Sequence, residues 1–364
     1  MHTKQLEELL AAMLRAGATS LHLIPGRPPC LRVQRRLVRS DDVPIVVGDV
    51  EELTKDLLFE DHRQRLRRNG QVEVLYVSRS GHRFRTTVML QDGGQTMLMR
   101  PVPETPPEVA QLELPPQVTS FSQYRSGLVL ITGFFGSGKS TTIAALLDRL
   151  AGESPRHLVS IEDPIEFLFP TKQALIHQRE VGVHVASFAD GVREAMRLGA
   201  DVIAVSDLRD AETLDGLLTA VEGGALVFAA LDASSVVGAM NELAGLVAPE
   251  ERPRLRTRLA TALRAVSAQT LLPRSHQQGR VPLIEVLINN SAVRAAIRQG
   301  AFSDLAGIMQ RYRGLGMQTT DVALRGLLAR HLITQEDALQ YVVDRDQVLL
   351  RAGTAGTPGQ NRAT

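Results

Sequence analysis

The spacing of apolar and polar residues divides the chain into two patterns, and the first pattern covers residues 1–100. Alternation typical of strands occurs in residues 20–39, 72–78, 83–90 and 96–100. Helical spacing of apolar residues occurs in residues 1–16 and 49–68. Together these elements predict a small α+β domain.

A proline-rich stretch follows this first pattern. Residues 101–116 contain six of the 18 prolines in the chain. Proline fixes the backbone in extended conformations and cannot donate a backbone hydrogen bond, so such a stretch is semi-rigid and extended. We therefore predict a linker over residues 101–118.

The second pattern alternates short apolar strands with helices. The predicted strands are residues 127–133, 157–163, 201–205 and 225–231. The predicted helices begin at Ser140 and near residues 187 and 210. This order is typical of a parallel sheet covered by helices. From residue 234 the pattern is mainly helical apart from a strand at residues 280–288, so residues 119–350 form the predicted α/β domain, and residues 351–364 a disordered tail.

Composition is consistent with a globular protein of two domains. The chain has 364 residues, is 44% hydrophobic and has a mean hydropathy of −0.03. No stretch approaches the roughly 18 uninterrupted apolar residues that a membrane-spanning helix needs, so we expect no integral membrane segment. Glu7 and Glu8 interrupt the apolar residues near the N-terminus, which favours an amphipathic helix over a secretory signal.

Charge and cysteine content exclude several classes of protein. The formal net charge is +1, so no overall field favours nucleic acid as a partner, and the local arginine-rich runs are typical of solvated helix or strand faces. The single cysteine, Cys30, excludes a disulfide framework and a four-cysteine zinc site. The nine histidines show no close spacing typical of metal ligands.

The strongest motif is GFFGSGKS at residues 133–140, between a predicted strand and a predicted helix. It matches G-x-x-x-x-G-K-[ST], in which glycines let several backbone N–H groups point at one phosphate. Lysine reaches the β- and γ-phosphates, and the hydroxyl of Ser140 binds Mg²⁺. Only four lysines occur in the whole chain, which makes the match specific. The predicted nucleotide-binding residues are Gly133, Gly136, Ser137, Gly138, Lys139, Ser140 and Thr141.

Two acidic residues stand at the carboxyl ends of predicted strands. Glu162 ends residues 157–163 and could orient the attacking water, although an acidic residue before proline also marks an ordinary turn. Asp207 follows residues 201–205 and could contact Mg²⁺ directly or through water, or could be a loop or helix-capping residue. For Asp210, a helix N-cap is the simpler interpretation.

At this point several segments together resemble the pilus-retraction ATPase (PilT-like) family of the secretion ATPase superfamily. The resemblance covers about residues 5–345. It rests on the segments GSGKSTTIAALL, SIEDPIEF, QREV, LVF, SAQTL, SAVRAAIRQG and GMQTTD, with RFRTTVML and MRPVP in the first domain.

The resemblance implies a P-loop (RecA-like) nucleotide domain with a smaller N-terminal α+β (PAS-like) domain. It also implies ATP and Mg²⁺ as ligands, and a hexameric ring in which one subunit's N-terminal domain packs on the next subunit's nucleotide domain. Arg85 and Arg100 become candidates for arginine fingers, Arg83 less directly, although each alone resembles a solvated strand residue. The implied setting is the cytoplasmic face of the inner membrane, beside the pilus platform protein.

The sequence departs from the family at three places. The strand that ends in Gly-Glu in the family ends here in Ser206 and Asp207. The two histidines of the family's His box are replaced by Ala225 and Asp232. Phe134 and Phe135 stand where the family usually has proline and threonine.

These departures leave three hypotheses open. The first is an active, slow ATPase that drives pilus retraction. The second is an ATP-binding ring component with negligible turnover that assists an active paralogue, in a homo-hexamer or a mixed ring. The third is an ATPase of a related secretion or DNA-uptake apparatus. An aspartate in place of glutamate withdraws the carboxylate by about one methylene, and a misplacement of roughly 1 Å can cost about 10²-fold in rate.

Overall fold

The computed structural model describes residues 3–33, 36–40, 44–46, 48–103, 105–276 and 279–342, and these form two compact units. The units are Met1–Thr105 and Pro106–Thr364. The boundary between them falls within the predicted linker. The predicted disordered tail, residues 351–364, lies outside the described residues.

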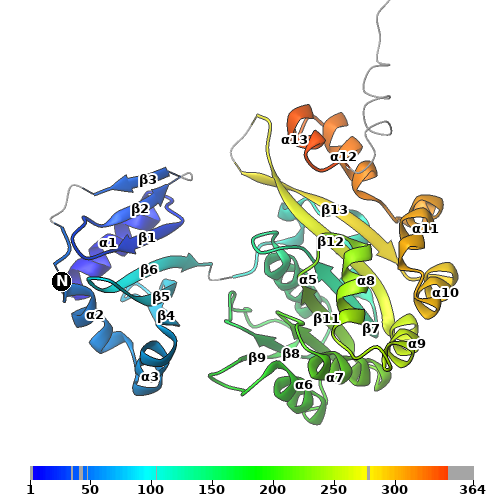
Figure 1. Cartoon of the computed structure of the whole chain (residues 1–364), viewed down its shortest axis with the longest axis horizontal. Coiled ribbons are helices and arrows are strands. Elements are labelled where there is room, and N and C mark those ends of the chain that lie inside the picture. The colour runs from blue at the N-terminus through cyan, green and yellow to red at the C-terminus, as the bar shows by residue number, and fades with distance from the viewer. Residues whose placement is uncertain are drawn as a thin grey trace, which may run out of the picture. The chain divides into compact units, whose positions relative to one another are not determined.

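The first unit is a six-stranded sheet with helices. Its strands lie in the order β3-β2-β1-β6-β5-β4, and every neighbouring pair is antiparallel (Figure 1). The strands are β1 (Ser20–Leu23), β2 (Cys30–Val33), β3 (Arg36–Arg39), β4 (Gln71–Val77), β5 (Arg83–Gln91) and β6 (Gly94–Val102). The helices are α1 (Thr3–Arg15), α2 (Asp49–Leu57) and α3 (Glu60–Asn69). Alternate residues of the strands pack with the apolar faces of α1 and α2 in one hydrophobic core.

The second unit is built on a seven-stranded sheet in the order β13-β12-β7-β11-β10-β8-β9 (Figure 1). The six strands from β12 to β9 are parallel, and β13 is antiparallel to β12. The strands are β7 (Gly127–Thr132), β8 (His157–Glu162), β9 (Leu175–Glu180), β10 (Val202–Val205), β11 (Leu226–Leu231), β12 (Leu263–Pro273) and β13 (Arg280–Ile288). The α/β class predicted for this part of the chain is confirmed.

Helices cover both faces of this sheet, and successive residues of β7 show the two sides. Leu128 and Leu130 belong to one buried core, whereas Val129 and Ile131 belong to the other. The helices are α4 (Pro116–Thr119), α5 (Lys139–Glu153), α6 (Phe188–Arg197), α7 (Ala211–Glu222), α8 (Val236–Gly245), α9 (Arg252–Ala262), α10 (Ser291–Gln299), α11 (Leu305–Arg311), α12 (Thr320–Ala329) and α13 (Gln335–Leu339). Within the described part of the chain, no helix combines the length and apolar character needed to cross a membrane.

The structure corrects the mainly helical pattern expected after residue 234. Residues 263–273 form the strand β12, which pairs with both β7 and β13. Small apolar residues such as Ala265 and Ala268 carry no clear strand signal, and it is burial between two neighbouring strands that makes them extended. The edge strand β9 was also not predicted, because its exposed and half-buried side chains do not form an apolar run.

The predicted linker is not extended over its whole length. The strand β6 continues to Val102, and the short 3-10 helix η1 covers Val109–Leu112 before α4 begins at Pro116. Proline suits the first turn of a helix because the backbone N–H that it lacks has no partner there. Val118 is fully buried in the core beneath α5, so the end of this segment belongs to the second unit.

Candidate nucleotide site

The predicted phosphate loop joins the carboxyl end of β7 to the first residue of α5. Gly133, Gly136 and Gly138 have φ values of 152°, 78° and 91°, which side chains other than glycine rarely tolerate. Gly138 is the N-cap of α5. The loop therefore curls back against the positive end of a 15-residue helix, as a phosphate-binding loop requires.

Crowding around Gly133 explains why a side chain is excluded there. A Cβ atom would lie 2.3 Å from the hydroxyl of Ser137 and 2.4 Å from the backbone oxygen of Gln269. The buried side chain of Gln269 on β12 donates to the carbonyl of Ser137 and accepts from the hydroxyl of Thr142. The strand β12 therefore holds the loop in place through Gln269.

Lys139 is directed back into the loop. Its ammonium group donates to the carbonyl of Gly133 at 2.7 Å and to that of Phe134 at 3.4 Å, and it forms an ion pair of 2.7 Å with Asp232. Asp232 follows β11, whose last residue is paired with Thr132 of β7. The departure from the family at this position therefore places a carboxylate directly on the lysine that a phosphate would use.

The hydroxyl of Ser140 lies beside the acidic residues of the neighbouring segment. It donates to Glu166 at 3.4 Å. A small cavity of about 30 Å³ behind it is lined by the polar side chains of Ser140, Ser160, Glu162 and Ser206, together with apolar residues. This volume is sufficient for one or two water molecules.

Glu162 is the last residue of β8 and is partly buried. Its carboxylate accepts hydrogen bonds from Ser160 at 2.7 Å, Gln178 at 3.0 Å and the backbone N–H of Glu166 at 3.4 Å. Burial raises the pKa of Glu162, and these hydrogen bonds oppose the shift only in part. A carboxylate with a raised pKa beside a cavity of water size is suited to act as a general base.

Asp207 lies at the carboxyl end of β10 and is paired with an arginine that the sequence analysis did not identify. Arg209 lies 3.5 Å from Asp207 and 3.1 Å from Asp163, so one guanidinium joins two acidic residues. The guanidinium also lies 5.1 Å from the ring centre of Phe188. Burial raises the pKa of Asp207, Arg209 opposes this shift, and Asp232 adds to it.

Magnesium at this site remains a prediction. Magnesium usually keeps several waters and takes only one or two ligands from the protein besides the phosphates. Our predicted magnesium residues are Ser140 and Asp207, which contact the ion directly or through water, and no cluster of three or more His, Cys, Asp or Glu ligands occurs among the described residues. Asp210, by contrast, accepts from the backbone N–H of Thr213 at 2.7 Å and is the N-cap of α7, as the simpler interpretation holds.

The two phenylalanines of the loop point outward. Phe134 is 63% exposed and Phe135 is 90% exposed. They therefore take no part in the core that supports the loop. The backbone of the loop carries the phosphate-binding geometry without them.

The arginine candidates lie on the sheet of the first unit. Arg85 on β5 and Arg100 on β6 are directly paired across the two strands. Arg85 forms an ion pair of 3.2 Å with Glu73, and Arg100 is exposed. The pKa of His22 is lowered by burial and by Arg32 and Arg100. Two positive charges therefore lie side by side on this sheet, with Glu73 as a partner for Arg85, and their role as arginine fingers remains a prediction.

Sequence reasoning missed three residues around the loop: Gln269, Arg209 and Arg280. Arg280 is the first residue of β13, and its guanidinium donates to the carbonyl of Gly136 at 3.4 Å. Gln269 and Arg280 belong to the strands β12 and β13, far from the loop in sequence, and although Gln269 lies in the segment SAQTL, nothing in that segment indicated a contact with the loop. Arg209 lies two residues after Asp207, and this short spacing was the one sequence signal that the two side chains could pair.

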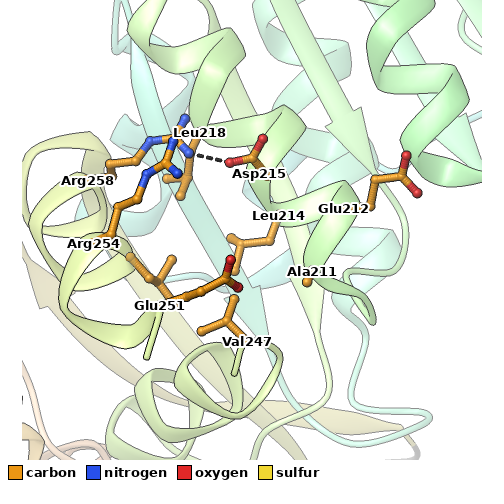
Figure 2. Close-up of a pocket in the computed structure, with 10 residues that line it drawn as sticks. Ala211, Glu212, Leu214, Asp215, Leu218, Val247, Glu251, Arg254 and Arg258 are labelled. Carbon is orange, nitrogen blue, oxygen red and sulfur yellow. Dashed lines mark hydrogen bonds and ion pairs between the residues drawn. The ribbon is translucent and has the colours of Figure 1, made fainter. Parts of the chain in front are cut away.

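A larger surface pocket of about 250 Å³ lies between α7 and α9 and contains none of the predicted nucleotide residues (Figure 2). Arg258 donates to Asp215 and, from the opposite side, to Glu222. The side chain of Arg258 is only 17% exposed. These contacts tie the two helices together, so the pocket is a by-product of their packing.

Residues 62–336 match the family model described as type II/IV secretion system protein. The chain is 36% identical to the uncharacterized protein YggR of Escherichia coli K12, over 86% of this chain and 95% of that protein. It is 35% identical to the type IV pilus retraction ATPase PilT of Pseudomonas aeruginosa, over 91% and 96% respectively. Identity to the type IV pilus ATPase PilU of the same organism is 31%, over 93% and 88%.

Solved structures give the same relationship. A crystal structure of the pilus retraction motor PilT with bound ADP superposes with a TM-score of 0.85 at 35% identity, covering 94% of this chain and 98% of that one. The Legionella pneumophila ATPase DotB superposes with a TM-score of 0.80 at 25% identity, covering 93% and 95%. The expected resemblance to PilT-like secretion ATPases is confirmed.

The raised pKa of Glu162 generates a prediction on pH. Because its pKa is raised, the folded chain binds a proton at this carboxyl more tightly than the unfolded chain does. Ionised Glu162 therefore disfavours the folded state above the raised pKa, and this penalty disappears as the pH falls. We expect the thermal midpoint of the wild type to rise relative to that of Glu162→Gln as the pH is lowered from about 8 to about 5.

The matched control is Glu250→Gln, which removes an exposed carboxylate from the same unit. Its thermal midpoint should follow that of the wild type across the same range. If the midpoint of the wild type instead falls relative to that of Glu162→Gln as the pH is lowered, the pKa of Glu162 is lowered in the folded chain.

Proposed function

The chain belongs to the type II/IV secretion system protein family, and on this basis we propose that it is an ATP-binding, ATP-hydrolysing motor of the type IV pilus machinery that drives pilus retraction. The observation that carries the proposal is the loop of residues 133–140. It has the motif, the three glycines with positive φ and the helix N-terminus that phosphate binding requires. Its relatives PilT and PilU are described as type IV pilus ATPases, and PilT has been crystallised with ADP.

Each residue of the site has a role in phosphoryl transfer. The loop holds the phosphates through backbone N–H groups, and Lys139 moves from the carbonyl of Gly133 to the β- and γ-phosphates. Ser140 and Asp207 hold magnesium, which when bound neutralises charge on the phosphate oxygens. Glu162 orients the attacking water from the cavity beside Ser140.

The complete motor is a homo-hexamer at the cytoplasmic face of the inner membrane. Arg85 and Arg100 of one subunit reach the nucleotide of the next and stabilise the charge that develops in the transition state. Their direct pairing across β5 and β6 supports a shared anionic target. The ring acts on the platform protein of the pilus.

A second candidate function is an ATP-binding ring component with little turnover of its own that assists an active paralogue. Two ion pairs favour it. Arg209 engages Asp207, and Asp232 engages Lys139, so both groups that must meet the metal and the phosphates have partners within the protein.

Turnover separates the two candidates. We expect the wild type to hydrolyse ATP with Mg²⁺ at a rate at least about a hundredfold above that of Lys139→Ala, because the lysine stabilises charge formed in the transition state. The measurement is phosphate release, made beside nucleotide affinity. Lys172→Ala, which removes a lysine paired with Asp148 outside the loop, is the matched control. Equal rates for the wild type and Lys139→Ala, with wild-type binding intact, would exclude the motor and leave the second candidate.

The departures from the family can be reversed in the same assay. The combined change of Asp207→Glu and Asp232→His should raise turnover by roughly tenfold or more, because it extends the carboxylate toward the metal and removes a negative charge from Lys139. Each single change measured alone shows which departure limits the rate. An unchanged rate in all three variants would mean that other residues limit hydrolysis.

Mixed rings test the proposed sharing of sites between subunits. Lys139→Ala and the double variant Arg85→Ala/Arg100→Ala should each be inactive alone. An equal mixture should recover up to about a quarter of wild-type turnover, because about one interface in four would combine an intact loop with intact arginines. Mixtures that remain inactive although rings form would show that these arginines do not act across subunits.

A further inference from the structure

The ammonium group of Lys139 is saturated by groups of the protein itself. A lysine has three N–H donors, and here two carbonyl oxygens and one carboxylate oxygen lie within 3.4 Å of its nitrogen. The Lys139 side chain is 14% exposed, so it has left most of its water to make these contacts. A phosphate can reach this lysine only by displacing an existing partner.

Asp232 is the one anionic group among these three partners. Its side chain is 66% exposed, and it follows β11, the strand beside β7. A carboxylate presents oxygens to an ammonium much as a terminal phosphate does. Asp232 therefore stands where a phosphate oxygen would accept from Lys139.

Further negative charge lies on the same side of the loop. Asp207 follows the next strand, β10, where the charge of Asp232 contributes to its raised pKa, and Arg209 is already shared between Asp207 and Asp163. The loop encloses the first phosphates through its backbone, whereas a third phosphate lies beyond the loop toward the lysine. The third phosphate therefore meets Asp232 more directly than the second does.

We propose that Asp232 is a specificity-determining residue that weakens the binding of nucleoside triphosphates relative to nucleoside diphosphates. This inference rests on the proposed nucleotide site at residues 133–140. Repulsion between Asp232 and the third phosphate, together with competition for Lys139, lowers affinity for the triphosphate. The diphosphate competes with Asp232 for Lys139 only through its second phosphate and brings no third phosphate to the carboxylate, so its affinity is lowered less.

The test compares two nucleotides and three variants of the full chain. Affinities for ADP and for the non-hydrolysable analogue AMP-PNP are measured by calorimetry with Mg²⁺ present. Asp232→Asn should tighten AMP-PNP binding by about tenfold and change ADP binding by less than about threefold, because it keeps the shape of the side chain and removes its charge. Asp304→Asn, which removes an exposed carboxylate at the end of the 3-10 helix η3 (Phe302–Asp304), should change neither affinity. Lys139→Ala should weaken both.

Salt provides a second measurement. Because the effect is a repulsion between partly exposed charges, the difference between the wild type and Asp232→Asn should shrink as ionic strength rises. A difference that does not depend on salt would overturn the electrostatic basis of the proposal.

The remaining outcomes are distinct. If both nucleotides bind and Asp232→Asn leaves their ratio unchanged, the inference is wrong while the proposed function stands. Weaker AMP-PNP binding in Asp232→Asn would also overturn it and would assign Asp232 to the metal. If the wild type and Asp232→Asn bind neither nucleotide, the proposed function fails and the inference fails with it.

Discussion

The site depends on one constraint, which is that strands β7, β11, β10 and β8 run parallel and in that order. Parallel strands bring their carboxyl ends to a single edge of the sheet, so the residues that follow them are collected there whatever their distance in sequence. The phosphate loop, Asp232, Asp207 and Glu162 are delivered in this way. Burial of both faces of the sheet under helices holds the edge rigid.

Charge at this edge is balanced within the protein. Lys139, Arg209 and the N-terminus of α5 supply positive charge, and Asp207 and Asp232 supply negative charge. In this structure each cation is paired with an acidic residue. In the proposed function, binding of a nucleotide and a metal exchanges partners among groups that are already satisfied.

Prediction from the sequence succeeded where the physical signal was local. The loop of residues 133–140 has fixed spacing and requires glycine at Gly133 for the packing that the structure shows. Buried strands such as β7 and β10 are continuous apolar runs, which is typical of parallel sheets. The strand β12 was missed because its extended conformation results from pairing with β7 and β13 and not from its own residues.

The sequence by itself determined that the chain has a glycine-rich loop with the phosphate-binding motif, an α/β second unit and acidic residues at the ends of two strands, because these features depend on residue type and local spacing. Only the tertiary structure decided the partners of those residues. The pairing of Lys139 with Asp232 joins residues 93 positions apart, and that of Arg209 with Asp163 joins residues 46 positions apart. Such contacts follow from the order of strands in the sheet, and strand order is a property of the packed fold and not of any short segment of the chain.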